Sequence, residues 1–121
     1  MSTQRPASTP FDIAEMRRRL GGDEELVRDI VGLFLEDYPV RMAAIQSAID
    51  SGQADGIRRA AHALKGGAST MSAFAVAEAA GRIEASGEAG DLASVGELFA
   101  ELTAEMERLA AVLRELHDAR S

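Results

Sequence analysis

Residues 91–118 read DLASVGELFAELTAEMERLAAVLRELHD, and the spacing of their apolar side chains decides the fold class. The apolar positions alternate at intervals of three and four residues: Leu92, Val95, Phe99, Leu102, Met106, Leu109, Leu113 and Leu116. This spacing puts all of them on one side of an α-helix, which we expect to begin near Asp91. A helix of this kind can pair with another chain as a coiled coil, or it can pack within its own chain.

Two more helical segments are expected before residue 52. Asp12 is placed to cap a short helix, Glu15 completes a capping box, and Gly21-Gly22 ends the helix. The next segment runs from near Asp23 to about Asp50, and its interior contains Pro39. Proline lacks a backbone donor and clashes with the preceding turn, so we expect a kink or a break there. Its apolar positions again follow helical spacing: Val27, Val31, Phe34, Tyr38, Met42, Ile45 and Ile49.

The remaining residues predict a third and a fourth helix. The third opens near Asp55 and carries its apolar residues on one side: Ile57, Ala61, Leu64, Ala68 and Met71. Ser72 is placed to cap the fourth helix, which we expect to end at Ser86-Gly87. No alternating strand pattern competes with these segments. Five amphipathic segments in one short chain favour an all-α fold, an antiparallel four-helix bundle with a short additional N-terminal helix.

Length and composition place limits on the class of protein. The chain has 121 residues and 46% hydrophobic residues, enough for one domain with an aliphatic core. Residues 1–10 are rich in Ser, Thr and Pro, so we expect a flexible leader there and the bundle in residues 11–120. The absence of cysteine excludes disulfides and thiol chemistry. The sequence shows no signal peptide and no apolar run of about 18 residues, so we expect a cytoplasmic protein without membrane insertion.

The charge is distributed unevenly along the chain. The net charge is −7, which argues against a nucleic-acid partner. Within residues 55–82, however, four basic side chains stand against two acidic ones: Arg58, Arg59, Lys65 and Arg82 against Asp55 and Glu78. A basic segment on an acidic protein is typical of a site that meets an anion, although chance clustering of surface charges gives the same pattern.

His62 lies in this basic segment, on the flank of the expected third helix. The helical repeat places Arg58, His62 and Lys65 in one stripe beside the core positions. A histidine titrates near neutral pH, so one on a flank can present a nucleophilic ring nitrogen to a partner. A phosphoryl group on that ring could be neutralised by Lys65, the only lysine of the chain, and by Arg58. These residues are candidates for a phosphoryl acceptor and its supporting cations.

Gly66 and Gly67 follow directly, and glycine disfavours a helix. One explanation is that Gly66 lies on the outer side of His62 and leaves room for another protein to approach the imidazole. The other explanation is that Gly66 ends the helix in left-handed geometry. Residue spacing alone leaves both explanations open.

The stretch Ala61–Ala68, AHALKGGA, resembles the HxLKG signature of histidine-containing phosphotransfer (HPt) domains, as in phosphorelay proteins and the phosphate-accepting domain of chemotaxis histidine kinases. The resemblance also covers residues 34–39, FLEDYP, and the long closing helix. It implies that His62 is the phosphoryl acceptor, that Lys65 supports the phosphate and that Gly66 keeps the surface open. Since the family's helix continues past the glycines, we expect the third helix to reach about Thr70. The family often has glycine where Ser72 stands, so the following turn is expected to differ in detail.

The resemblance implies a phosphorelay intermediate. His62 would accept a phosphoryl group from the aspartate of a receiver domain, or from a kinase, and pass it to another receiver. The implied partners are a response-regulator receiver domain, a hybrid sensor histidine kinase, or both. The sequence shows no Gly-rich nucleotide loop, so we expect no autonomous ATP-dependent activity. We also expect no cofactor on this chain, Mg²⁺ on the partner receiver, and a monomer.

The sequence argues against several other functions and leaves one alternative open. A di-metal bundle needs Glu-x-x-His pairs, but Arg59 and Arg114 stand three residues before the two histidines. His117 lies among charged residues and is expected to be solvated. The histidine helix of a sensor kinase usually has an acidic residue directly after its histidine, where this chain has Ala63. The open alternative is a helical interaction module that docks a regulator or kinase without carrying phosphate.

Overall fold

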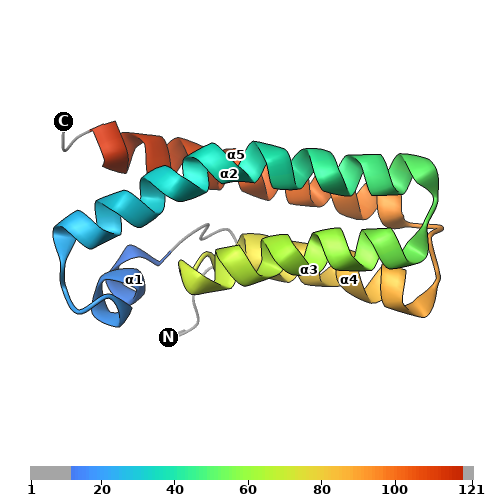
Figure 1. Cartoon of the computed structure of the whole chain (residues 1–121), viewed down its shortest axis with the longest axis horizontal. Coiled ribbons are helices and arrows are strands. Elements are labelled where there is room, and N and C mark those ends of the chain that lie inside the picture. The colour runs from blue at the N-terminus through green and yellow to red at the C-terminus, as the bar shows by residue number, and fades with distance from the viewer. Residues whose placement is uncertain (1–11, 119–121) are drawn as a thin grey trace, which may run out of the picture.

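The computed structural model describes residues 12–118, which form an antiparallel bundle of four long helices with a short helix at one end (Figure 1). The elements in chain order are α1 (Ile13–Arg19), α2 (Glu24–Ser51), α3 (Ala54–Thr70), α4 (Phe74–Ala89) and α5 (Val95–Asp118). No strand occurs among residues 12–118. The predicted all-α class, with its short additional N-terminal helix, is therefore confirmed. The expected leader, residues 1–10, lies outside the described residues.

The four long helices pack as two pairs. α2 and α5 lie along one side of the bundle, α3 and α4 lie along the other, and consecutive helices run in opposite directions (Figure 1). Every helix within the described residues is too short or too polar to span a membrane. This arrangement gives each helix two long neighbours, so each needs an apolar side wide enough to face both.

The core is aliphatic, as the composition predicted. The side chains that are less than 2% exposed come from all five helices and include Met16, Val31, Ile45, Ile57, Leu64, Ile83, Leu102, Leu109 and Leu113. Those on α2, α3 and α5 are among the apolar positions whose spacing predicted these helices. The apolar side chains of residues 92–116 thus pack within the chain, so this helix does not need a coiled-coil partner.

Most predicted helix ends agree with the structure, but two in the second half of the chain were wrong. α4 continues to Ala89 and ends at Gly90, whose φ of +71° is the left-handed conformation that glycine takes without strain. It does not end at Ser86-Gly87. α5 begins at Val95 rather than Asp91, because Asp91 accepts a hydrogen bond from the backbone N–H of Ala93 and forms a turn instead.

A kink or a break was expected at Pro39, and α2 remains continuous there, so a break is excluded. The helix axis changes direction about halfway along, as expected for a proline kink (Figure 1). The predicted start is confirmed, because the Asp23 carboxylate accepts a hydrogen bond from the backbone N–H of Leu26. At the start of α1, the Asp12 carboxylate likewise accepts from the backbone N–H of Glu15. The Glu15 carboxylate itself pairs with Arg18.

Ser72 does not cap α4, and that prediction was wrong. It follows the C-cap of α3 with a φ of +60°, and its hydroxyl accepts a hydrogen bond from Arg19 Nη1 at 3.0 Å. The N–H of Ala73 donates to the carbonyl of Ala68, and the N–H of Ser72 donates to the carbonyl of Ser69. These two bonds form a Schellman motif, in which the left-handed position is usually glycine. Serine occupies this position here, and the hydrogen bond from Arg19 holds its side chain in place.

α3 and α4 make the most extensive helix pair of the bundle. Their backbones approach closely at Gly87, where an added Cβ would lie 2.7 Å from the carbonyl oxygen of Ala54 and 2.8 Å from the nitrogen of Arg58. Both distances are to backbone atoms, which cannot turn aside. The missing side chain of Gly87 therefore sets how closely the two helices pack.

We predict that Gly87→Ala destabilises the bundle by about 1–3 kcal/mol, the usual cost of overpacking, although alanine is the better helix former by about 1 kcal/mol. Urea denaturation measures the difference. The matched control is Gly96→Ala in α5, where an added Cβ meets nothing within 4 Å. Equal stability of the Gly87 variant and the wild type would contradict this account of the helix contact.

Candidate functional site

The site is built on the side of α3 that faces α4. His62 is exposed over 64% of its side chain, and its Nδ1 atom lies 2.8 Å from Oε2 of Glu84 on α4. No hydrogen bond within residues 12–118 engages the other ring nitrogen, Nε2. The predicted flank position is therefore observed. The imidazole is fixed through one nitrogen and presents the other to solvent.

Lys65 joins the same carboxylate. Its Nζ atom lies 2.6 Å from Oε1 of Glu84, so one carboxylate binds the lysine with one oxygen and the histidine with the other. The Glu84 side chain is only 17% exposed. The sequence predicted that His62 and Lys65 lie close together, and the structure shows that an acidic group connects them.

The electrostatics of the site centre on Glu84. The ammonium of Lys65 hydrogen bonds to the carboxylate and is the main reason why the pKa of Glu84 lies below its usual value of 4.5. Partial burial acts in the opposite direction, and the hydrogen bond with His62 lowers the pKa further. Glu84 is thus held as an anion, which favours the imidazole tautomer that carries its proton on Nδ1. In that tautomer the lone pair is on Nε2.

Glu84 was missed because the sequence gives it no local signal. It lies 22 residues from His62 and resembles any acidic residue on a helix flank. The signal that could have found it is the register of the α3–α4 hairpin. In two antiparallel helices joined by a short turn, residues equally far from the turn lie side by side. Glu84 is as far after Ala73, the N-cap of α4, as His62 is before it.

Arg58, the second predicted cation, points elsewhere in the structure. Its guanidinium donates to Asp55 at 2.9 Å and holds the pKa of that carboxyl below its usual value of 3.8. Arg59 also pairs with Asp55. The basic segment seen in the sequence is therefore largely neutralised by neighbouring carboxylates. No described contact joins Arg58 to His62, and its role in binding phosphate stays a prediction.

Gly66 and Gly67 lie inside α3, which runs on to Thr70 as predicted. An added Cβ at either glycine would meet nothing within 4 Å. Neither glycine has a positive φ among the described residues, so the explanation that Gly66 ends the helix is wrong. No side chain projects from these two positions, so the surface beside His62 is low, that is, open to an approaching protein.

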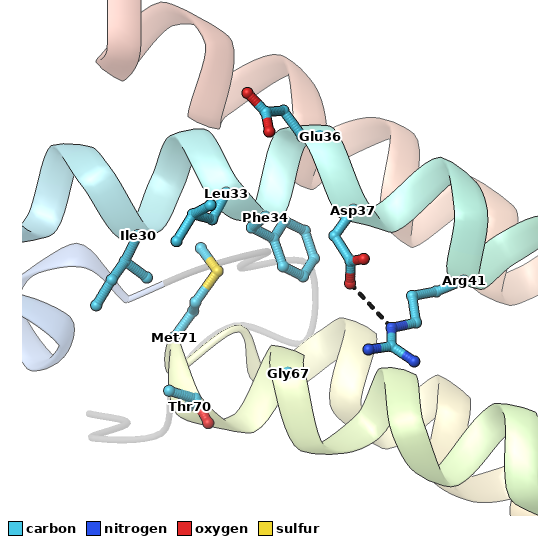
Figure 2. A pocket seen from close by; sticks show the side chains of 9 residues that line it. All are labelled: Ile30, Leu33, Phe34, Glu36, Asp37, Arg41, Gly67, Thr70 and Met71. Atoms are coloured by element: carbon cyan, nitrogen blue, oxygen red, sulfur yellow. Dashed lines mark hydrogen bonds and ion pairs between the residues drawn. The ribbon is translucent and has the colours of Figure 1, made fainter.

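An open groove lies between α2 and α3, and Gly67 borders it on the α3 side, about midway along (Figure 2). Leu33 and Ile30 of α2 stand over Met71 and Thr70, and the Asp37–Arg41 ion pair marks the other end. Large apolar side chains along the outer part of α2 are exposed to solvent: Leu26, Leu33 and Val40, the last two by 64% and 67%. An apolar row of this kind is typical of a surface that meets another protein.

His117, the other histidine, lies far along the chain on α5. Its ring packs against Gly32 of α2, and its side chain is 36% exposed. The expected solvated position is therefore only partly observed. His117 lies at a different part of the bundle surface, in a hollow that also borders Arg28 and Glu36.

Comparison with known proteins adds to this geometry. The family model described as "Hpt domain" matches residues 29–112. Among solved structures, the histidine-containing phosphotransfer protein B from Pseudomonas aeruginosa superimposes with a TM-score of 0.86. The two chains share 22% sequence identity, and the match covers 92% of this chain and 96% of that one. A search of curated proteins gave no match.

The lowered pKa of Glu84 predicts a pH dependence of stability. A carboxyl with a depressed folded-state pKa stabilises the fold above its unfolded pKa of about 4.5 and loses this contribution as the pH falls through the folded value. We expect Glu84→Gln to cost up to about 1 kcal/mol near neutral pH, because the ion pair is partly exposed. The difference from the wild type should shrink at an acid pH below 4.5.

Urea denaturation at both pH values measures this difference. The matched control is Glu107→Gln, which removes the same charge from an exposed position of α5. A Glu84→Gln penalty that is as large at low pH as at neutral pH would show that the carboxylate charge does not stabilise the fold.

Proposed function

Because the chain belongs to the Hpt domain family, we propose that it is a phosphorelay intermediate that carries a phosphoryl group on His62. Histidine phosphotransfer within phosphorelays is the function that the family and the fold support. The solved relative is itself titled a histidine-containing phosphotransfer protein. The single observation that carries the proposal for this chain is the contact between Glu84 and Nδ1 of His62, which leaves Nε2 exposed.

The proposed chemistry uses the lone pair of Nε2. This atom attacks the phosphorus of an aspartyl phosphate on a partner; the N–P bond forms, the P–O bond to aspartate breaks, and the aspartate leaves as a carboxylate. The ring keeps its proton on Nδ1 and becomes positively charged, and the anionic Glu84 stabilises that charge. The same steps in reverse pass the phosphoryl group to a second receiver.

Lys65 is proposed to neutralise the phosphoryl group on the ring. It lies one helical turn from His62, and its ammonium can rotate from Glu84 toward a phosphate on Nε2. Phosphoryl transfer needs positioning and charge neutralisation more than covalent help from the carrier. The aspartate and Mg²⁺ are therefore expected on the partner receiver, and no ATP-dependent activity is expected of this chain alone.

The partner is expected to cover α3 from the α2 side. Glu84 and Lys65 occupy the α4 side of His62, whereas the low surface at Gly66 and Gly67 continues into the groove bordered by Leu33. A receiver that docks here could bury the apolar row on α2 while its aspartate reaches Nε2. A response-regulator receiver or a hybrid sensor histidine kinase fits this description. We further propose that the carrier is a monomer in the cytoplasm.

Replacement of His62 tests whether the chain carries phosphate on this residue. His62→Gln should abolish phosphate uptake from a phosphorylated receiver domain and leave the helical content unchanged, because His62 is exposed and outside the core. An assay for acid-labile phosphate after incubation measures this, with His117→Gln as the control that keeps uptake. Retained uptake in His62→Gln would contradict His62 as the acceptor, and no uptake by the wild type would favour the alternative, an interaction module that does not carry phosphate.

Variants of Gly66 and Lys65 separate receiver binding from phosphoryl transfer. Gly66→Gln should leave stability equal or slightly higher, since glutamine is the better helix former and the space is open. Transfer should nevertheless fall sharply, because a displacement of about 1 Å at the reacting atoms can cost about 100-fold in rate. Lys65→Ala should keep receiver binding and slow transfer.

The thermal midpoint, receiver affinity and transfer rate are measured on the same samples. Gly96→Gln is the control, because that position is also an open helical glycine and lies on α5. Normal transfer by Gly66→Gln would show that the partner does not approach over this surface.

A further inference from the structure

Gly81 is a glycine in the interior of α4, where glycine disfavours the helix relative to alanine. It lies three residues before Glu84, so the two positions share one side of the helix. Unlike Gly66, Gly67 and Gly96, it does not border open space. An ideal Cβ at Gly81 would lie 3.5 Å from Cδ of Lys65.

The side chain of Lys65 therefore crosses α4 above Gly81 on its way to Glu84. Its methylene groups occupy the space that a side chain at position 81 would fill, and its ammonium emerges 2.6 Å from Oε1 of Glu84. The Lys65 side chain is 37% exposed, a low value for lysine on a surface helix. Packing of the stem with exposure of the charged end is the usual way in which lysine lies on an apolar surface.

The hairpin register brings these residues together. Lys65 and Gly81 are about equally far from the α3–α4 turn, and His62 and Glu84 are related in the same way. Gly81 thus faces Lys65 one turn away from the point where Glu84 faces His62. The two contacts are neighbouring parts of one helix–helix interface.

We propose that Gly81 is a positioning residue: its missing side chain provides the space in which the Lys65 stem packs, and this holds the ammonium between Glu84 and His62. The inference rests on the proposed function for its effect on transfer, but not for its effect on the position of Lys65. With the stem confined, the ammonium needs only a rotation of its last bonds to reach a phosphate on Nε2. A Lys65 stem displaced into solvent would have to lose its conformational freedom in every phosphoryl transfer.

The distance at Gly81 indicates which substitutions matter. A Cβ at 3.5 Å from Cδ is an ordinary van der Waals contact, so Gly81→Ala should be tolerated. Gly81→Val adds two γ-methyl groups on a side chain that is held in one rotamer in helices. One of them would occupy the space of the Lys65 stem and displace the lysine. The displacement of Lys65 should therefore depend on the size of the new side chain and occur only when that side chain extends beyond Cβ.

The experiment compares Gly81→Ala and Gly81→Val with Gly96→Val, which introduces valine at a helical glycine that borders open space. The first readout is the titration of the Glu84 carboxyl carbon, followed by NMR in the unphosphorylated protein. In Gly81→Val the midpoint should rise toward the usual value for glutamate, because the Lys65 ammonium that lowers the pKa has moved away. It should stay at the wild-type position in Gly81→Ala and Gly96→Val.

The second readout is the rate of phosphoryl transfer. Gly81→Val should slow transfer about as much as Lys65→Met, which keeps the stem and removes the charge. The double variant should be no slower than either single one, because both changes remove the same contact. Wild-type values for both the titration and the transfer rate in folded Gly81→Val would overturn the proposal.

One measurement on the wild type needs no variant to fold. The proposal requires nuclear Overhauser contacts between the Lys65 side-chain methylenes and the α-protons of Gly81, and their absence would overturn it. The proposed function and the positioning role of Gly81 can fail separately. A wild-type chain that takes up no phosphate but shows these contacts and the Gly81→Val shift of Glu84 would contradict the proposed function and leave the positioning of Lys65 intact.

Discussion

The close packing of α3 against α4 is the constraint on which the rest of the structure depends. At Gly87 the two backbones leave no room for a single carbon atom, which limits the registers that the helix pair can adopt. The observed register brings Glu84 on α4 opposite His62 on α3. A helix pair held apart by larger side chains would leave the histidine as an ordinary exposed residue. The contact between Glu84 and His62 therefore depends on Gly87, a residue that has no side chain and takes no part in the chemistry.

The fold was readable from the sequence because apolar spacing is a local property. Residues 92–116 and the apolar positions of α2 and α3 predicted helices that the structure contains, and Asp23 predicted where α2 begins. The errors arose where tertiary contacts override local preference. Ser72 has the side chain of an N-cap, but the Schellman turn and Arg19 hold it elsewhere. Gly87 resembles a helix stop, but its lack of a side chain serves the contact with α3.

The site was only half predictable for the same reason. His62, Lys65 and Gly66 lie within five residues of one another, so their shared surface follows from the helical repeat. Glu84 belongs to another helix, and only the register of the hairpin connects it to them. Arg58 shows a different limit of the prediction. It lies on the predicted face, but its side chain turns to a nearer partner, Asp55. Helix geometry predicts which residues share a face, but not which of them will pair.

The two sides of α3 have different roles in this arrangement. The α4 side holds the charges that orient the imidazole, and the α2 side offers low and apolar surface for a partner. The central claim is that Glu84 holds the Nδ1 proton of His62 and leaves the lone pair on Nε2. Long-range ¹H–¹⁵N correlation spectra of the imidazole, recorded at a pH where the ring is neutral, test it most directly. We predict a ring protonated on Nδ1 with an unprotonated Nε2; a ring protonated on Nε2 would contradict the claim.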